Sequence, residues 1–425
     1  MPGKDVVEYL FIGGGLANAT AAQEVRARDA DGRIVIIAAE THLPYHRPPL
    51  SKEYLRGEAG WDEALVAKEA DWAEKRIEVR TGTRAAALNT TTREVALDTG
   101  ETLTYEKLCL ATGATPKRLS PDDVPGAAAP NVHVLRTRDD SDALRGYLRP
   151  GARAVLIGAG YIGMEVAADC RQKGVEVTVV DTAPQPWGRF ASPAFGGFLQ
   201  RYYEKNGVRF LLNDGVKEIV TDARGDATAV RTKSDQHLPA DFVLVGIGVS
   251  LNLELAKRAG LRLDEKEGVE VSEFLQTSAR DVYAAGDIAK FTDPVMGKSW
   301  HVEHWQNAEW HGQIAGANMA GELIAYDHVP WFFSDEFDLH MTLRGDSQSA
   351  KSSFFVGSPE TDKRFLELYL RDDGTLAMGL LISPETDEEA TADLLEKLIR
   401  ARIHLGPYQE ELASQKRALE SFLPA

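Results

Sequence analysis

The chain has 425 residues, a formal net charge of −17 and 43% hydrophobic residues. This length predicts two or three globular domains, and no apolar run is long enough to cross a bilayer. The acidic balance argues against nucleic acid and anionic membranes as partners, because binding to either depends on Lys and Arg. The N-terminus enters an apolar strand almost at once, which leaves no room for a signal peptide. We therefore expect a cytoplasmic protein.

The first predicted elements place a glycine-rich turn between a strand and a helix. A strand over residues 8–12 runs into GGGLAN at 13–18, followed by a helix over 19–28 and a strand over 33–38 that ends near Glu40. Glycines let a pyrophosphate approach the backbone, the helix N-terminus attracts phosphate, and a carboxylate takes ribose hydroxyls. Asn18 stands at the third glycine position, so we expect looser packing of helix on strand there.

A second glycine turn carries the full pattern. The apolar run 154–157 leads into GAGYIG at residues 158–163, and a second apolar strand over 175–180 ends in Asp181. The first glycines of the two turns, Gly13 and Gly158, are 158 − 13 = 145 residues apart. Two such turns predict that two dinucleotides bind at once.

Each turn is followed by the same later pattern. Polar, strand-rich segments cover residues 77–104 and 208–238, and each precedes an apolar strand that ends in glycine, at 108–113 and 242–248. A further strand-like run over 281–287 returns the chain towards the first domain. This order is typical of nested α/β domains.

The chain has only two cysteines, Cys109 and Cys170, and no CxxC or CxxxxC motif. It therefore lacks the redox-active disulfide of glutathione-reductase-like flavoenzymes, and both thiols are expected to be small buried hydrophobes. His301, His304 and His311 have no acidic ligand pattern beside them, so we expect no metal site.

Five segments in order carry a resemblance to a known family: residues 43–52 (LPYHRPPLSK), 111–116 (ATGATP), 158–165 (GAGYIGME), 284–287 (AAGD) and 330–335 (PWFFSD). From about residue 9 to 343 the chain resembles the flavoproteins with two dinucleotide domains that include ferredoxin, putidaredoxin and rubredoxin reductases and apoptosis-inducing factor. The resemblance implies an FAD-dependent NADH oxidoreductase with an α/β fold: two nested Rossmann-like domains, glutathione-reductase-like, and a C-terminal α/β domain.

The resemblance implies that the first site holds FAD. The expected contacts are Gly13, Gly15, Glu40, Arg47, Lys52, Ala111, Thr112, Gly113, Arg136, Gly286, Asp287 and Trp305. Carboxylates accept hydrogen bonds from ribose or ribityl hydroxyls, and guanidinium groups pair with phosphates. The helix that begins near Trp305 would direct its N-terminus at the flavin N1 and O2 edge. The alternative for Glu40 and Arg136 is that each is a solvated surface residue that does not contact FAD.

The resemblance also pairs Lys52 with Glu165 beside the flavin. A cation near N5 would favour electron-rich reduced flavin, and the carboxylate would keep the lysine charged. Phe333 stands where the family often has a tryptophan that shields the nicotinamide or flavin face. We expect Lys52, Glu165 and Phe333 to be the catalytic residues.

The second site is expected to take NADH. The expected contacts are Gly158, Gly160, Tyr161, Ile162, Gly163, Glu165, Asp181, Arg189 and Gly248. Asp181 would repel a 2′-phosphate, and residues 182–187 offer no basic side chain to bind one. Arg189 matches a family arginine on the adenosine side of NADH, although a solvated surface charge fits it equally.

These assignments predict three parts: a discontinuous FAD domain over 1–114 and 240–328, an NADH domain over 115–239, and a C-terminal α/β domain over 329–425. The last contains strands over 365–370 and 376–381, and a helix over 387–403 whose apolar side we expect to pack on its own sheet. Nothing in the sequence indicates an oligomeric state.

The resemblance implies that the electron acceptor is a small redox protein, a quinone or oxygen. From Trp331 onward the chain has 10 Lys and Arg against 18 Asp and Glu. This balance disfavours an acidic ferredoxin and predicts faster reduction of small quinones, ferricyanide or oxygen. The alternative is an NADH-responsive flavoprotein like apoptosis-inducing factor, which forms a stable charge-transfer complex and acts through partner binding or oligomerisation.

Overall fold

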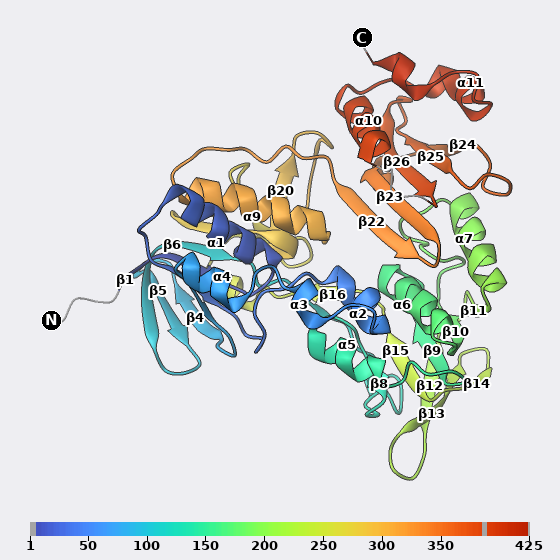
Figure 1. The fold of residues 1–425 in the computed structure, drawn as a ribbon, viewed down its shortest axis with the longest axis horizontal. Coiled ribbons are helices and arrows are strands. Elements are labelled where there is room, and N and C mark those ends of the chain that lie inside the picture. Colours follow the sequence, from blue (N-terminus) through green and yellow to red (C-terminus); the bar gives the residue numbers. More distant parts are fainter. Residues whose placement is uncertain (1–5, 385–388, 424–425) are drawn as a thin grey trace. The chain divides into compact units, whose positions relative to one another are not determined.

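The computed structural model describes residues 6–384 and 389–423 of the chain. By contacts between its residues, the chain divides into two compact units. Unit 1 comprises residues 1–46, 61–115 and 250–330, and unit 2 comprises residues 47–60, 116–249 and 331–425. Figure 1 shows the elements of both units, each of which is described by itself below.

Unit 1 is built on a sheet whose order is β3-β2-β1-β6-β5-β4, with β19 also paired to β6. Its strands are β1 (Val6–Ile12), β2 (Ile34–Ile37), β3 (Ile77–Arg80), β4 (Ala85–Asn89), β5 (Glu94–Leu97), β6 (Thr102–Leu110) and β19 (Val282–Ala284). β1 pairs in parallel with both β2 and β6, so that Leu10 lies opposite Val35 and Leu108. All four residues of β2 are buried, as expected of a parallel strand covered on both faces.

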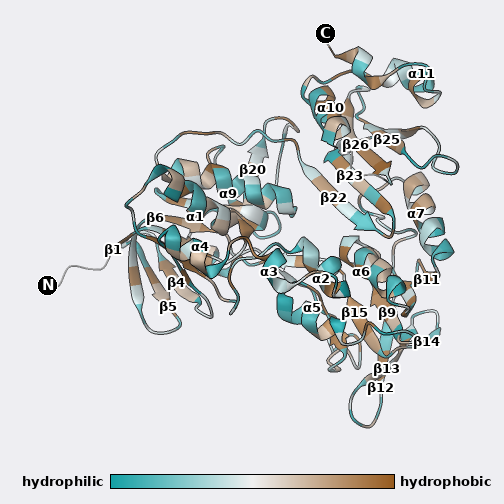
Figure 2. Ribbon diagram, viewed as in Figure 1, coloured by the Kyte–Doolittle hydropathy of each residue, from teal (hydrophilic) through white to brown (hydrophobic). Residues whose placement is uncertain are grey.

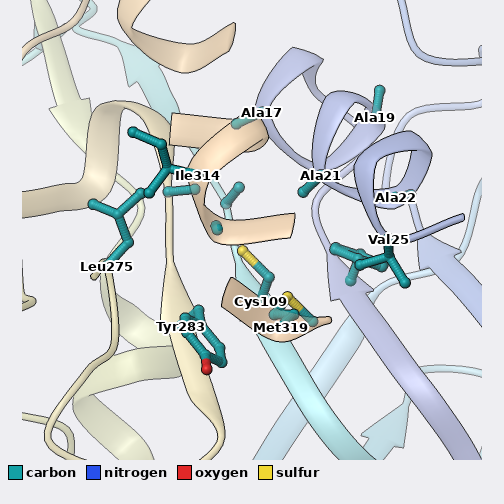
Figure 3. Packing of buried hydrophobic residues seen from close by; sticks show 14 of the residues in the cluster. Ala17, Ala19, Ala21, Ala22, Val25, Cys109, Leu275, Tyr283, Ile314 and Met319 are labelled. Atoms are coloured by element: carbon teal, nitrogen blue, oxygen red, sulfur yellow. The ribbon is translucent and has the colours of Figure 1, made fainter. Parts of the chain in front are cut away.

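Two helices that pack on each other in unit 1 are α1 (Leu16–Arg28) and α9 (Trp305–Met319). Their packing needs small residues: a Cβ on Gly312 would lie 2.4 Å from the Ala17 carbonyl oxygen, and one on Gly316 would lie 2.5 Å from that of Ala21. Figure 3 shows the core beside them, where Cys109 and Met319 lie close together. This packing holds the N-termini of both helices in place.

The remaining elements of unit 1 are short. They are α3 (Trp61–Ala64), α4 (Glu69–Glu74), α8 (Glu254–Arg258), β17 (Leu263–Asp264), β18 (Gly268–Glu270), β20 (Ala289–Asp293) and β21 (Lys298–Trp300). The last four strands form a separate small sheet in the order β17-β18-β20-β21. Two further short strands, β7 (Ala114–Pro116) and β16 (Val249–Leu251), lie where the chain passes from one unit to the other.

Unit 2 contains a second parallel sheet with the order β11-β10-β9-β15-β8. Its strands are β8 (Val132–His133), β9 (Arg153–Ile157), β10 (Glu176–Val180), β11 (Val208–Leu211) and β15 (Phe242–Val245). The chain was expected to return to the first domain near residue 240. Instead β15 pairs in parallel with β9, because its apolar residues complete this sheet, and the return follows it.

The helices of this part of unit 2 are α2 (Glu53–Arg56), α5 (Arg138–Arg145), α6 (Tyr161–Gln172) and α7 (Pro193–Lys205). A small antiparallel sheet consists of β12 (Val216–Thr221), β13 (Ala227–Thr232) and β14 (His237–Pro239). This sheet covers most of the strand-rich segment predicted over 208–238, whose first strand, β11, belongs to the parallel sheet instead.

The C-terminal part of unit 2 is an antiparallel sheet in the order β22-β23-β26-β25-β24. Its elements are β22 (Trp331–Glu336), β23 (Leu339–Gly345), β24 (Ser352–Val356), β25 (Phe365–Leu370), β26 (Leu376–Ser383), α10 (Glu389–Arg400) and α11 (Gln409–Ala413). Leu395 of α10 lies on Gly379 of β26, which confirms that the helix packs on its own sheet. The first two residues predicted for that helix, 387 and 388, lie outside the described residues.

The hydropathy of the elements follows this layering. Figure 2 shows hydrophobic residues along the strands and hydrophilic residues along much of the helical surface. Among residues 6–384 and 389–423, no helix combines the length and apolar composition that a bilayer span requires.

Candidate dinucleotide sites and active site

The first glycine turn, in unit 1, contains glycines of two kinds. Gly13 has φ +116°, and a Cβ there would lie 2.2 Å from the Ala111 carbonyl oxygen, so the fold itself requires glycine. Gly15 differs, because a Cβ there would meet nothing within 4 Å. The side of the turn next to the N-terminus of α1 is therefore open. That is the position at which a phosphate would approach the backbone.

Asn18 does not leave a gap at the third glycine position. Its side chain is fully buried, and its Nδ2 donates a hydrogen bond to the Gly13 carbonyl oxygen at 2.9 Å. The amide thus ties α1 back to the glycine turn, an arrangement that counting glycines does not predict.

The other FAD residues predicted in unit 1 lie at strand ends. Glu40 follows β2 and accepts a hydrogen bond from the Tyr45 hydroxyl. Thr112, after β6, donates to the Asn252 carbonyl oxygen at 2.7 Å, and Asn252 donates back to the Thr112 carbonyl oxygen at 2.9 Å. The backbone N–H of Asn252 also donates to Gly113 at 2.9 Å. Asn252 therefore fixes residues 111–113, although it was not among the residues selected from the sequence.

A second turn in unit 1 lies against the two packed helices. Gly286 has φ +69°, and a Cβ there would lie 3.4 Å from Ala17 of α1 and 3.9 Å from Ala308 of α9. Its backbone N–H donates to Nδ1 of His311 at 3.2 Å. Burial lowers the pKa of His311 to about 3, so the ring stays neutral and accepts this bond. His311 therefore supports the turn that carries Asp287.

The N-terminus of α9 is anchored by Trp305, whose indole Nε1 donates to Nδ1 of His46 at 3.0 Å. No side-chain cap hydrogen bond is made at this end of α9. Within the described ranges, no three His, Cys, Asp or Glu side chains gather as a metal site would need.

The second glycine turn, in unit 2, repeats the pattern of the first. A Cβ on Gly158 would lie 2.3 Å from the Gly246 carbonyl oxygen, and a Cβ on Gly163 would lie 2.0 Å from that of Gly158. A Cβ on Gly160 would meet nothing within 4 Å. Gly160 is therefore not needed for packing, as Gly15 is not in unit 1. It leaves open space where α6 begins.

The helices that begin at these turns are among those of the chain that no side chain caps. α1 and α6 begin after Gly15 and Gly160 without a side-chain cap hydrogen bond. In contrast, Thr137 caps α5 and Ser192 caps α7 with a side-chain oxygen. Helices that lack such caps leave N–H donors for another partner, and the phosphates of a dinucleotide supply acceptors. The two turns therefore fit a dinucleotide each.

Asp181 lies at the end of β10, beside the second turn. Its carboxylate accepts hydrogen bonds from the backbone N–H of Ala159 at 2.5 Å and of Ala183 at 2.7 Å. It thus links the glycine turn to the loop after β10. Arg189 of that loop is exposed. Gly248 has φ +97° and open space around its Cβ position.

Aromatic residues cover the start of α6. The Tyr161 ring lies 4.1 Å from that of Phe332, 4.6 Å from Phe190 and 4.7 Å from Trp187, measured between ring centroids. Ile162 beside it is 38% exposed. Phe332 was not selected from the sequence, because Phe333 occupies the family's tryptophan position.

Phe333 lies on the other side of β22 from these contacts. Successive residues of a strand point to opposite faces, so Phe332 and Ser334 share the face towards α6, and Phe333 shares the opposite face with Trp331. The rings of Phe333 and Trp331 are 5.8 Å apart. The role of Phe333 as a shield stays a prediction.

Lys52 and Glu165 form the predicted ion pair. Lys52 Nζ lies 2.8 Å from Glu165 Oε1, and each side chain is 7% exposed. The hydroxyls of Ser51 and Ser334 donate to Glu165 Oε2 and Oε1 at 2.5 Å and 2.7 Å. Burial opposes the lysine charge, but the charge of Glu165 and its hydrogen bond outweigh this effect, so the pKa of Lys52 is raised. The lysine is held charged in a dry environment.

The predicted arginines also meet in unit 2. Arg47 donates a hydrogen bond from its guanidinium to the Arg136 carbonyl oxygen. Arg47 also begins the Pro-rich segment that carries Lys52, so the three predicted cationic contacts of FAD, which include Arg136, are connected.

Both cysteines are free, fully buried thiols, Cys109 in β6 and Cys170 in α6. Burial raises the pKa of each above its ordinary range, so neither is a reactive thiolate.

These features define a two-dinucleotide α/β oxidoreductase. The sequence profile of the family described as pyridine nucleotide-disulphide oxidoreductase matches residues 7–312. The chain belongs to this family. The predictions of FAD and NADH as cofactors and of a flavoprotein oxidoreductase without a redox-active disulfide are confirmed.

Relatives match the chain over almost its whole length. The ferredoxin–NAD(+) reductase component of the anthranilate 1,2-dioxygenase system of Burkholderia cepacia is 36% identical over 98% of this chain and 99% of its own. Putidaredoxin reductase of Pseudomonas putida is 32% identical over 97% and 98%.

Solved structures agree with this. The ferredoxin reductase for the CYP199A2 system of Rhodopseudomonas palustris superposes with a TM-score of 0.90, at 31% identity over 98% of this chain and 99% of its own. The reductase in the covalent putidaredoxin reductase–putidaredoxin complex gives 0.91, at 29% identity over 98% and 97%.

Proposed function

We propose that this protein passes electrons from NADH, through bound FAD, to a ferredoxin-type iron–sulfur protein. The observation that carries the proposal is the pair of open glycine turns, one in each unit, in a chain with no reactive cysteine. Two dinucleotides fit these turns, and without a thiol relay the electrons must leave to an external acceptor. Relatives along the whole chain are reductases of ferredoxins.

Each unit contributes its own groups to this reaction. The turn at Gly15 with the N-terminus of α1 would hold the FAD pyrophosphate, and the turn at Gly160 with α6 would hold that of NADH. Asp181 would meet the free ribose hydroxyls of NADH and reject a 2′-phosphate. FAD, when bound, accepts a hydride and yields two electrons singly. The division into an FAD domain, an NADH domain and a C-terminal domain is part of the proposal.

The Lys52 ammonium group, held by Glu165, supplies the positive charge of the proposed active site. Its hydrogen bonds fix the ammonium group, and burial strengthens its field because little water screens it. A fixed positive charge favours the added negative charge that reduction brings.

The identity of the electron acceptor needs its own argument, because two observations point in different directions. The charge balance of the C-terminal domain favours small quinones or oxygen over an acidic ferredoxin, whereas the relatives reduce ferredoxins. Among its acidic residues, Glu336 and Glu367 are buried and present no charge to a partner. We therefore propose a ferredoxin-type acceptor whose docking depends weakly on charge. A cytoplasmic location stays a prediction from the sequence.

The experiment is an acceptor panel under anaerobic conditions. NADH-driven reduction of several ferredoxins, putidaredoxin among them, is compared with that of menadione and ferricyanide. Faster turnover with a ferredoxin supports the proposal, and turnover confined to the small acceptors rejects the ferredoxin assignment.

A further inference from the structure

Glu336 is a second carboxyl group in the buried cluster around Lys52. It is the last residue of β22, two residues after Ser334, so both side chains lie on the face of the strand that packs against α6. Glu336 is fully buried, as is Ser334. β22 and α6 both belong to unit 2, where Figure 1 labels them.

The hydrogen bonds around Ser334 leave Glu336 short of donors. The single hydroxyl hydrogen of Ser334 is given to Glu165 Oε1 at 2.7 Å. Ser334 Oγ is also 3.5 Å from Glu336 Oε1, but it has no second hydrogen to donate there. Glu336 Oε2 has no hydrogen-bond partner among residues 6–384 and 389–423. An ionised carboxylate in this position would be buried without a firm donor, which is costly.

The charges around Lys52 also make an ionised Glu336 side chain unfavourable. Its one buried ammonium group, Lys52, already pairs with Glu165. A second buried negative charge would have no cation of its own. The titratable or charged groups that face Glu336 come from the Lys52 segment, α6, α7 and β22 itself; they are Lys52, Glu165, Tyr161, Tyr202, Tyr203 and the neighbouring Asp335. The phenols bring no positive charge. Tyr203 lies close enough to Glu336 for its hydroxyl to lower the pKa of that carboxyl by hydrogen bonding, but burial outweighs this effect, and the same hydroxyl hydrogen is directed at the Met164 carbonyl oxygen at 3.0 Å.

We propose that Glu336 is a neutral carboxylic acid that holds one proton beside the Glu165 carboxylate, with Ser334 between them, and so adds no further negative charge to offset the positive charge of Lys52. As an acid, Glu336 can donate to Ser334 Oγ, whose own hydrogen goes to Glu165. Glu336 acts through Lys52 and Glu165 and is therefore a positioning residue. Burial, and after it the charge of Glu165, raises the pKa of Glu336 to about 8.

The proton of Glu336 has a defined effect on stability. The folded protein holds this proton up to about pH 8, whereas the unfolded chain releases it near the ordinary value of 4.5. Folding therefore binds a proton between these limits, and the free energy of unfolding falls as pH rises through that window. The variant Glu336→Gln has a neutral side chain of the same shape that does not titrate, so its stability should fall less over the same range.

The proton is read directly by infrared spectroscopy of the FAD-loaded protein. A neutral carboxylic acid has a carbonyl stretch above the amide bands. We expect such a band at pH 6.5, its loss as pH rises past about 8, and a weaker band in Glu336→Gln. The difference spectrum between the parent and this variant is the measurement, because burial also raises the pKa of Asp169 to about 8. Glu367→Gln is the matched control, because Glu367 is a buried carboxylate of the same sheet that accepts hydrogen bonds from Ser353 and Tyr369 at 2.6 Å each. The control should keep the band.

The consequence for reaction rests on the proposed function. Lys52 Nζ already lies 2.8 Å from Glu165 and 4.0 Å from the exposed carboxylate of Asp335. Loss of the proton would place a third carboxylate near this one ammonium group and weaken its attraction for negative charge. Reduction of bound flavin by NADH should therefore slow above about pH 8 in the unmodified protein and remain level in Glu336→Gln.

The outcomes distinguish the assignment of a proton to Glu336 from the proposed function. No infrared band assignable to Glu336 at pH 6.5, or equal pH dependence of unfolding in the parent and Glu336→Gln, would overturn the inference. A protein that shows the band but is not reduced by NADH would instead reject the proposed function and leave the assignment of the proton intact.

Discussion

The Lys52 ammonium lies 2.8 Å from Glu165 Oε1 in an environment that leaves each side chain only 7% exposed. Breaking such a buried pair by removing one partner costs about 3–5 kcal/mol, because the other charge stays buried without compensation. Glu165→Ala should therefore lower the free energy of unfolding by about this amount. It also removes the acceptor of the Ser51 and Ser334 hydroxyls.

The control is the double variant Lys52→Met with Glu165→Leu, which removes both charges and keeps an apolar filling. It should recover most of the stability while reduction of flavin by NADH stays slow. Urea unfolding at a fixed excess of FAD measures the first effect, and stopped-flow absorbance measures the second. Equal stability of the single variant and the parent would show that the pair is not buried as described.

The two kinds of glycine in the second turn predict different outcomes for the same substitution. Gly163→Ala places a Cβ 2.0 Å from the Gly158 carbonyl oxygen, so the fold should lose about 1–3 kcal/mol of stability. Gly160→Ala places a Cβ in open space and should leave the melting temperature unchanged. It should weaken the use of NADH, on the order of 100-fold in kcat/KM, because a displacement of about 1 Å at the phosphate spoils alignment. A normal KM for NADH in Gly160→Ala would place the dinucleotide elsewhere.

Asp181 predicts a preference for NADH over NADPH. Replacing Asp181 by Ala and Gln185 by Arg removes the repulsion of a 2′-phosphate and supplies a cation for it. The ratio of kcat/KM for NADH to that for NADPH should fall by about tenfold or more, which is ~1.4 kcal/mol. Since Asp181 also accepts hydrogen bonds from Ala159 and Ala183, Asp181→Asn is the control for loosening of the loop. Equal use of both nucleotides by the unmodified protein would reject this role of Asp181.

Much of the fold follows from the sequence because the glycine turns and apolar runs are local signals. The strands around Gly13 and Gly158 and the helices after them were predicted within a few residues. The position of β15 was not, because the partner of an apolar strand depends on the whole sheet, and its sequence fits either one.

The site residues show a similar division. Lys52 and Glu165 were expected as a pair only through the family resemblance, since 113 positions separate them in the chain. Phe332 and Glu336 were missed. A single phenylalanine in a row of aromatics does not reveal which face it takes, and a lone glutamate is usually at the surface. For both, the alternation along β22, with Ser334 between them, is the signal that could have found them.

Turnover distinguishes a reductase from an NADH-responsive flavoprotein of the apoptosis-inducing factor kind. With excess NADH and no oxygen, a long-wavelength charge-transfer band should form and then disappear rapidly when an acceptor is added. A sensor would keep the band for long periods and change its oligomeric state on reduction. Stopped-flow absorbance and size-exclusion chromatography, each with and without NADH, measure these two properties.

The central claim is that electrons pass from NADH to a ferredoxin-type protein, and the most direct test is the rate of that reduction over a series of ionic strengths. The C-terminal domain is acidic, with 10 basic against 18 acidic residues from Trp331 onward. We therefore expect reduction of at least one ferredoxin of the panel to exceed that of menadione and oxygen, and to change by less than about threefold between low and physiological salt. Fast reduction that falls steeply with salt would contradict the weak role given to charge. Faster reduction of the quinone than of every ferredoxin, at every salt concentration, would contradict the central claim.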